Sequence, residues 1–142
     1  MKTAKQVLED KSPDIWTATS DALVVDAAKL MTEKEIGAVL VVDNDKVVGI
    51  VSERDCVREF VVNSAKELRV REIMTKQVVY IRPEQTSAEC MALMNHKNIR
   101  HLPVIDGNDL LGVISMKDVA KELIADQEFL IEQLENYIVG TQ

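Results

Sequence analysis

An internal repeat is the feature that most constrains how this sequence can fold. The stretch Gly49-Ile50-Val51-Ser52-Glu53-Arg54-Asp55 returns as Gly112-Val113-Ile114-Ser115-Met116-Lys117-Asp118, an offset of 63 residues (112 − 49). In this register the agreement runs without a gap from Val7/Val70 to Glu59/Glu122. Agreement over most of a chain predicts two copies of one structural unit in tandem.

The length of the chain favours a shared core. A chain of this size buries roughly 68% of its unfolded surface, whereas a unit of half the size is marginally stable alone. We therefore expect the two units to fold together, with their apolar faces packed about a pseudo-two-fold axis. The composition, 46% hydrophobic and 29% charged residues, is that of a globular protein.

Charge and hydropathy exclude several classes of partner. The formal net charge is −7 and the basic residues are scattered, which argues against a nucleic-acid partner. No apolar run approaches the roughly 18 residues of a membrane span, and the N-terminus has no apolar signal core. We predict a cytoplasmic protein without a membrane partner, in which Cys56 and Cys90 are reduced, buried thiols.

Apolar periodicity and turn residues predict the order strand, helix, strand, strand, helix in each unit. For the first unit we expect a helical lead-in at 4–11, a strand at 14–19, a helix capped by Ser20 or Asp21, a hairpin of 38–42 with 47–51, and a helix from 52 to about 61. The first of the long helices has an apolar stripe formed by Leu23, Ala27, Leu30 and Met31.

The second unit is expected to repeat this order after a polar connection at 63–68. The corresponding elements are a strand at 77–82, a helix at 86–97 with a capping box of Thr86 and Glu89, a hairpin at 102–114 and a helix from Ser115. The fold class is therefore α/β (α+β), with two small sheets. The tail continues as a helix whose apolar residues pack on a symmetry mate or on their own core; they are Leu123, Leu130, Leu134, Tyr137 and Ile138.

The repeated motif has the residue types of a nucleoside phosphate site. Each glycine lets another backbone or a ligand approach closely, and each serine lies at a helix N-terminus, which favours phosphate or hydroxyl oxygens. Asp55 and Asp118 are placed to accept both hydroxyls of a ribose. The same S-x-x-D spacing is also a helix-capping pattern, in which the serine bonds to a backbone amide and the aspartate stabilises the first turn.

Four basic groups accompany the two motifs. Arg100 and His101 precede the second hairpin and suit phosphate oxygens, and Arg54 and Lys117 each stand one residue before a motif aspartate. The alternative for each is an ordinary surface salt bridge.

Two other kinds of site do not fit the residues of this sequence. A hydrolase triad of Ser115, His101 and Asp118 lacks a G-x-S-x-G elbow, and the repeat explains the serine better. Cys90, His96 and His101 do not have the spacing of zinc ligands.

With these motifs in their order, the chain resembles a tandem pair of CBS domains, the Bateman module, as found in stand-alone bacterial two-CBS proteins. The resemblance covers about residues 7–125 and rests on Ile36-Gly37-Ala38, Val70-Arg71-Glu72-Ile73-Met74-Thr75, Arg100-His101-Leu102-Pro103-Val104 and the two G-h-h-S-x-x-D motifs, where h is apolar. On this basis CBS domain 1 spans 7–66, CBS domain 2 spans 70–126, and a helical tail spans 127–142.

The resemblance implies a non-catalytic sensor that binds an adenosine-containing ligand in a cleft between the repeats, often as a homodimer. Carried over, Asp55 and Asp118 hold ribose hydroxyls, with Ser52 and Ser115 beside them. The Asp55 cleft then takes its phosphate contacts from the second unit, where the residues concerned are Arg100, His101 and Lys117. The adenine lies near Trp16, Thr17 and Ala18 or near Val79, Tyr80 and Ile81.

The two clefts are not expected to be equal. The positions that match Arg100 and His101 are Gly37 and Ala38, which have no charge, although Arg54 partly compensates. We therefore assign the phosphate to the Asp55 cleft. AMP is the first candidate, followed by NAD, with ADP, ATP and S-adenosylmethionine also in the class. The alternative is an interaction or scaffold module with vestigial clefts. Either module acts on a separate protein that the sequence does not name.

Overall fold

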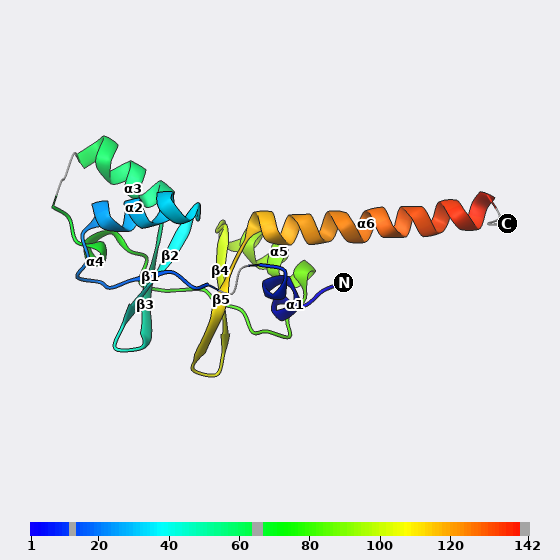
Figure 1. The fold of residues 1–142 in the computed structure, drawn as a ribbon, viewed down its shortest axis with the longest axis horizontal. Helices are drawn as coiled ribbons and strands as arrows, with labels where there is room; N and C mark the ends of the chain where they lie inside the picture. The colour runs from blue at the N-terminus through cyan, green and yellow to red at the C-terminus, as the bar shows by residue number, and fades with distance from the viewer. Residues whose placement is uncertain (12–13, 64–66, 140–142) are drawn as a thin grey trace. The chain divides into compact units, whose positions relative to one another are not determined.

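The computed structural model describes residues 1–11, 14–63 and 67–139. As expected, helices combine with two small sheets, one of order β1-β2-β3 and one of order β4-β5. The chain divides into two compact units, one formed by Ile15–Val79 and the other by Met1–Asp14 together with Tyr80–Gln142 (Figure 1). No helix in the described part is long and apolar enough to cross a membrane.

The unit Ile15–Val79 has a three-stranded sheet covered by helices. In chain order its elements are β1 (Thr17–Ala18), α2 (Val24–Lys34), β2 (Ala38–Asp43), β3 (Lys46–Ser52), α3 (Glu53–Arg58), a π-helical turn (Glu59–Asn63) and α4 (Val70–Ile73). β1 runs parallel and β3 antiparallel to β2. The expected hairpin is confirmed. Its turn residues Asn44 (φ 49°) and Asp45 (φ 63°) have the left-handed backbone that tight hairpins require.

The core of this unit joins one face of α2 to the sheet. Its buried members are Val24, Ala27, Met31, Val39, Val41, Val51, Cys56 and Val70. The predicted stripe on this helix is therefore confirmed at Ala27 and Met31, with Leu30 partly buried against the same cluster. Residues 64–66 of the predicted polar connection lie outside the described residues.

The predicted cap of α2 is wrong. The N-cap residue is Leu23, without a side-chain hydrogen bond, and the amide of Val24 donates to the carbonyl of Leu68 at 2.8 Å. A backbone carbonyl from a distant segment therefore satisfies one of the free amides at the start of this helix. Ser20 instead donates to the carboxylate of Asp43, and these hydrogen bonds hold the pKa of Asp43 below its usual value. Asp21 pairs with Arg71.

The other unit has a two-stranded antiparallel sheet and the long C-terminal helix. Its elements are α1 (Ala4–Glu9), α5 (Ser87–Lys97), β4 (His101–Asp106), β5 (Asp109–Ser115) and α6 (Met116–Val139). The expected lead-in helix, hairpin and continuous tail helix are confirmed. Thr86 caps α5 by accepting a hydrogen bond from the Glu89 amide at 3.2 Å, while the Glu89 carboxylate accepts from the side chain of Gln85. The predicted capping box is thus confirmed in only one direction.

The strand predicted at 77–82 is wrong except at a single residue. Ile81 forms an isolated parallel bridge with Val104, in which its amide donates to Pro103 and its carbonyl accepts from Ile105, both at 2.9 Å. In the first repeat Thr17 pairs with Leu40, and Pro103 stands where that leucine does. Proline has no N–H to extend the ladder, so the strand is reduced to one bridge.

The short helices α1 and α4 each belong to the repeat that they do not precede in the sequence. The amide of Ala4 donates to Gln85 at 2.7 Å, and the amide of Val70 makes the same bond to Ala22 at 2.8 Å. Gln85 follows Ala22 by 63 residues, whereas Val70 follows Ala4 by 66. The ungapped register predicted from Val7/Val70 is therefore wrong at these helices, and the segment after α1, which includes Lys11, is three residues longer than its counterpart.

The distal part of α6 continues past the other elements of its unit (Figure 1). Its apolar side chains are more than half exposed, at 59% for Leu130, 53% for Leu134 and 85% for Tyr137. Packing of this stripe on its own core, one of the two expectations, is therefore wrong for these three residues. The side chain of Ile138 lies outside the described residues.

Candidate functional site

Both S-x-x-D motifs form reciprocal capping boxes. The Asp55 amide donates to Ser52 Oγ at 3.2 Å, and the Ser52 amide donates to Asp55 Oδ2 at 3.0 Å. The corresponding distances for Ser115 and Asp118 are 3.1 and 2.8 Å. The capping interpretation is thus confirmed at both helices. Capping alone leaves each carboxylate able to accept further hydrogen bonds, because each of its oxygens can accept two.

The motif glycines make room for side chains of the short helices. A Cβ on Gly49 would lie 2.6 Å from Met74 Sδ and 3.0 Å from the carbonyl oxygen of Thr75. A Cβ on Gly112 would lie 2.9 Å from Leu8 Cδ2. The close approach predicted at these strands is therefore made by protein, from α4 in one unit and α1 in the other.

The surroundings of Asp55 leave its carboxylate able to accept further bonds. Its side chain is 20% exposed, and the nearest cation is Arg58, whose Nη2 lies 3.5 Å from Oδ1. That separation fits an ion pair on neighbouring helical turns, which is weak at a surface. Oδ2 accepts the Ser52 amide. A ligand with two adjacent hydroxyls can donate one bond to each oxygen.

Asp118 has a second, stronger partner. Lys11 Nζ lies 2.8 Å from Asp118 Oδ2 and also donates to the carbonyl of Val113 at 3.0 Å. Burial disfavours the ionised form of Asp118, but hydrogen bonds from Lys11 and Ser115 outweigh it and hold the pKa of Asp118 below its usual value. Sequence reasoning missed Lys11. The only signal was the longer segment after α1, which the ungapped repeat register concealed.

The segment before each hairpin bonds to the start of the helix that follows the hairpin. The Glu53 amide donates to Gly37 at 2.9 Å, and the Met116 amide donates to Arg100 at 2.8 Å. In the sheet, Ser52 pairs with Ala38 and Ser115 pairs with His101. The structure therefore brings four of the predicted site residues together within one unit, namely Arg100, His101, Ser115 and Asp118.

The remaining predicted residues differ in accessibility. Arg54, Lys117, Arg100 and Thr17 are exposed and Ala18 is half-buried. Tyr80 is 54% exposed, whereas Ile81 is completely buried. Trp16, expected near the adenine, lies under Lys34, whose Nζ is 4.2 Å from the ring centroid.

The two cysteines are free and buried, as predicted. Burial, reinforced by the neighbouring carboxylates, raises the pKa of each thiol to about 11. Among residues 1–11, 14–63 and 67–139, no group of three His, Cys, Asp or Glu side chains is arranged to hold a metal ion.

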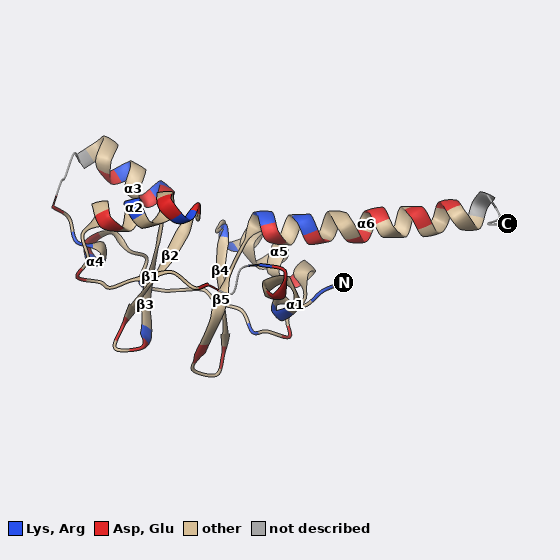
Figure 2. Ribbon diagram, in the orientation of Figure 1, with Lys and Arg blue, Asp and Glu red and all other residues tan. Residues whose placement is uncertain are grey.

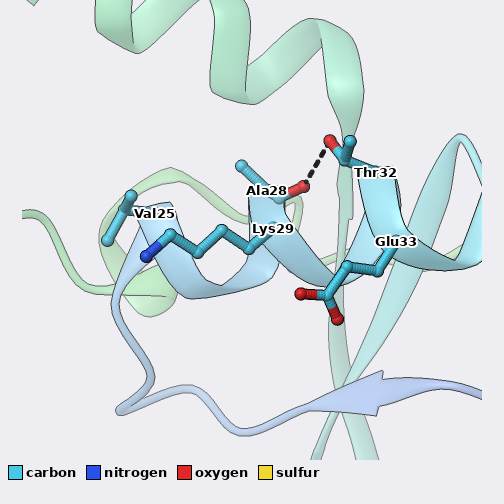
Figure 3. Close-up of a pocket in the computed structure, with 5 residues that line it drawn as sticks. All are labelled: Val25, Ala28, Lys29, Thr32 and Glu33. Carbon is cyan, nitrogen blue, oxygen red and sulfur yellow. Dashed lines mark hydrogen bonds between the residues drawn. The ribbon is translucent and has the colours of Figure 1, made fainter.

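A shallow hollow lies along α2, with a volume of about 430 Å³. All of its lining residues come from this one helix; they are Val25, Ala28, Lys29, Thr32 and Glu33 (Figure 3). The Thr32 hydroxyl donates to the Ala28 carbonyl at 3.0 Å. None of the predicted site residues lines this hollow.

Comparison with known families gives a match in both repeats. The family model described as CBS domain matches residues 5–62 and 70–125. A CBS domain-containing mitochondrial protein of Arabidopsis thaliana is 34% identical over 133 residues, which are 89% of this chain and 64% of that protein. The chain spans 64%, 38% and 36% of the length of the first three curated relatives that it matches.

Two solved structures match this chain over nearly their full length. A protein with CBS domains from Burkholderia ambifaria is 49% identical, with a TM-score of 0.83, over 88% of this chain and 96% of that one. A CBS domain pair in complex with 5′-methylthioadenosine and S-adenosyl-L-methionine is 26% identical, with a TM-score of 0.79, over 89% of this chain and 98% of the other.

Proposed function

The chain belongs to the CBS-domain family, of which it contains a tandem pair, and we propose that it is a non-catalytic regulatory module that binds an adenosine-containing ligand at Asp55. The single observation that carries this proposal is that the Asp55 carboxylate, beside Ser52, can still accept hydrogen bonds from a ligand. The related pair solved with 5′-methylthioadenosine and S-adenosyl-L-methionine supports the ligand class.

Ribose suits the Asp55 carboxylate for a geometric reason. The 2′ and 3′ hydroxyls are adjacent donors, and the two oxygens of a carboxylate are adjacent acceptors. Hydrogen bonds to a charged acceptor are stronger than bonds between neutral groups, so the diol gains more than it loses by leaving water. The capping box holds the carboxylate in one orientation before the ligand arrives, which lowers the entropy cost of binding.

AMP is the first candidate within this class. A ligand with at least one phosphate makes use of the cationic side chains that the sequence offers, and Arg100 and Lys117 are exposed. Arg100, His101 and Lys117 belong to the other compact unit, so their contact with a ligand at Asp55 remains a prediction. NAD, ADP, ATP and S-adenosylmethionine are the further candidates. A cytoplasmic location and a separate regulated protein also remain predictions.

Thermal unfolding tests the proposal and identifies the ligand. The wild type and Asp55→Ala are heated with and without millimolar AMP, ADP, ATP, NAD and S-adenosylmethionine. A ligand at 100 times its Kd adds about 2.7 kcal/mol, a shift of several degrees in a domain of this size. We expect a shift with one or more of these compounds that disappears in Asp55→Ala. An unchanged Tm with all five would leave the scaffold alternative.

A homodimer accompanies this function in our proposal. The exposed apolar residues of distal α6 form the surface that a second copy of the chain would cover; they are Ile124, Leu130, Ile131, Leu134 and Tyr137. A helix with a continuous apolar stripe gains stability chiefly by burying it.

A further inference from the structure

Lys11 makes the carboxylate of Asp118 different from that of Asp55, the other candidate ribose acceptor. Its Nζ bridges Asp118 Oδ2 at 2.8 Å and the Val113 carbonyl at 3.0 Å, so the ammonium group is held by two acceptors at once. The side chains of Lys11 and Asp118 are 36% and 23% exposed. All three residues belong to the same compact unit.

The equivalent carbonyl in the other repeat has a different donor. Ile50, which precedes Val113 by 63 residues, accepts a hydrogen bond from the Thr75 amide at 2.9 Å. The backbone after α4 therefore satisfies this carbonyl directly. After α1, the side chain of Lys11 donates to the equivalent carbonyl of Val113, and its Nζ also donates to Asp118.

The number of hydrogen bonds that Oδ2 already accepts determines what each of the two carboxylates can still bind. Asp118 Oδ2 accepts two hydrogen bonds, from the Ser115 amide and from Lys11 Nζ, both at 2.8 Å, which fills its lone-pair sites. Asp55 Oδ2 accepts only the Ser52 amide among the hydrogen bonds described at this oxygen. A diol that donates one bond to each carboxylate oxygen fits Asp55 and meets a filled acceptor at Asp118.

We infer that Lys11 is a built-in competitor that closes the Asp118 site, so that the chain binds one adenosine ligand, at Asp55. This inference rests on the proposed ligand class. The ammonium group occupies the place of a ribose hydroxyl donor and compensates the charge of Asp118, so a ligand must displace it before the second site can fill. Lys11 is therefore a specificity-determining residue that sets the stoichiometry.

Equilibrium dialysis with AMP, and separately with S-adenosylmethionine, tests the inference by counting ligands bound per chain. Lys11→Met keeps an unbranched side chain, shorter by the terminal nitrogen, and removes its donors. We expect one ligand in the wild type and two in Lys11→Met, with the affinity of the second site raised at least tenfold. The gained site disappears in Lys11→Met/Asp118→Ala. Lys11→Arg keeps a cation at the position and stays at one ligand.

A matched control separates this effect from a general loss of positive charge in the N-terminal segment. Lys5→Met makes the same replacement at an exposed lysine of α1 and should leave the stoichiometry at one. Circular dichroism on each variant shows whether the fold is retained, and Lys11→Ala, which also has no donor, replaces Lys11→Met if the latter unfolds.

The outcomes distinguish this inference from the proposed function. If the wild type binds nothing but Lys11→Met binds one ligand through Asp118, Lys11 does close the Asp118 site, whereas the assignment of a ligand to Asp55 fails. Two ligands in the wild type overturn the inference and leave the ligand class intact. Equal binding by the wild type and Lys11→Met overturns it whatever their common stoichiometry.

Discussion

At the scale of single residues, Asp118 and Lys11 make stability depend on pH. Because the folded protein holds the pKa of Asp118 below that of the unfolded chain, the ionised carboxylate stabilises the fold above the unfolded value of about 3.9. That contribution is lost as the pH falls through the lower, folded pKa. Its size is modest because both side chains are partly exposed.

Asp118→Asn should therefore destabilise the protein at pH 7 by about 1 kcal/mol, after allowance for solvent screening, and by less as the pH falls below about 4. Urea unfolding at a series of pH values measures this difference. Asp109→Asn, at an exposed residue of the hairpin, is the control and should show little change. A deficit of Asp118→Asn that is constant down to pH 2 would contradict the ionic origin of the effect.

Gly49 gives a second prediction at this scale. A methyl group there meets Met74, which can move, and the carbonyl of Thr75, which is held by its neighbours. We expect Gly49→Ala to cost about 1 to 3 kcal/mol in unfolding free energy. In a Met74→Ala background the cost should be smaller, because one of the two clashes is removed. Equal costs in both backgrounds would place the strain elsewhere.

The residue scale also shows where sequence reasoning ended. Ser52, Asp55, Ser115 and Asp118 were predicted as capping or ribose-binding groups, and the repeat alone indicated them. The repeat did not indicate Lys11. Its contact with Asp118 depends on the segment after α1, which is three residues longer than its counterpart in the other repeat. The types of the residues in a sequence do not show where the side chain of Lys11 points.

At the scale of elements, apolar periodicity predicted the long helices and both hairpins, since burial of one face dictates them. It failed where backbone partners come from distant segments. The start of α2 is satisfied by Leu68, and the strand at 77–82 is interrupted by the lack of an N–H on Pro103. Neither contact has a local signature in the sequence.

The prediction at the scale of elements concerns dimerisation through α6. After Lys121 every charged residue of this helix is acidic (Figure 2), so two copies that meet along it repel each other; the residues are Glu122, Asp126, Glu128, Glu132 and Glu135. Pairing through the apolar stripe should therefore strengthen as added salt screens this repulsion. In sedimentation velocity, Leu130→Glu/Leu134→Glu should be monomeric. Ala125→Glu, which adds a charge at an exposed position on the opposite face of the helix, should remain dimeric. A dimer that survives the double substitution would exclude α6 as its interface.

At the scale of the whole molecule, the tandem repeat was the strongest signal, because two copies of one motif constrain the fold twice. The family and the mixed α+β architecture followed from it. The exchange of α1 and α4 between repeats did not follow from it. In the sequence α1 precedes the first repeat and α4 precedes the second, whereas in the structure each helix belongs to the other repeat's compact unit. Because of this exchange, Asp118 is paired with Lys11, which lies 107 residues earlier in the sequence.

The most direct measurement of the central claim compares equivalent carboxylates. Asp55→Asn and Asp118→Asn remove the same charge from the two repeats while each asparagine keeps an oxygen for the serine amide. Equilibrium dialysis with the adenosine compound that raises the wild-type Tm most gives the affinity of each. We predict at least a tenfold loss of affinity in Asp55→Asn and little change in Asp118→Asn. Wild-type affinity in Asp55→Asn would contradict the assignment of the ligand to Asp55.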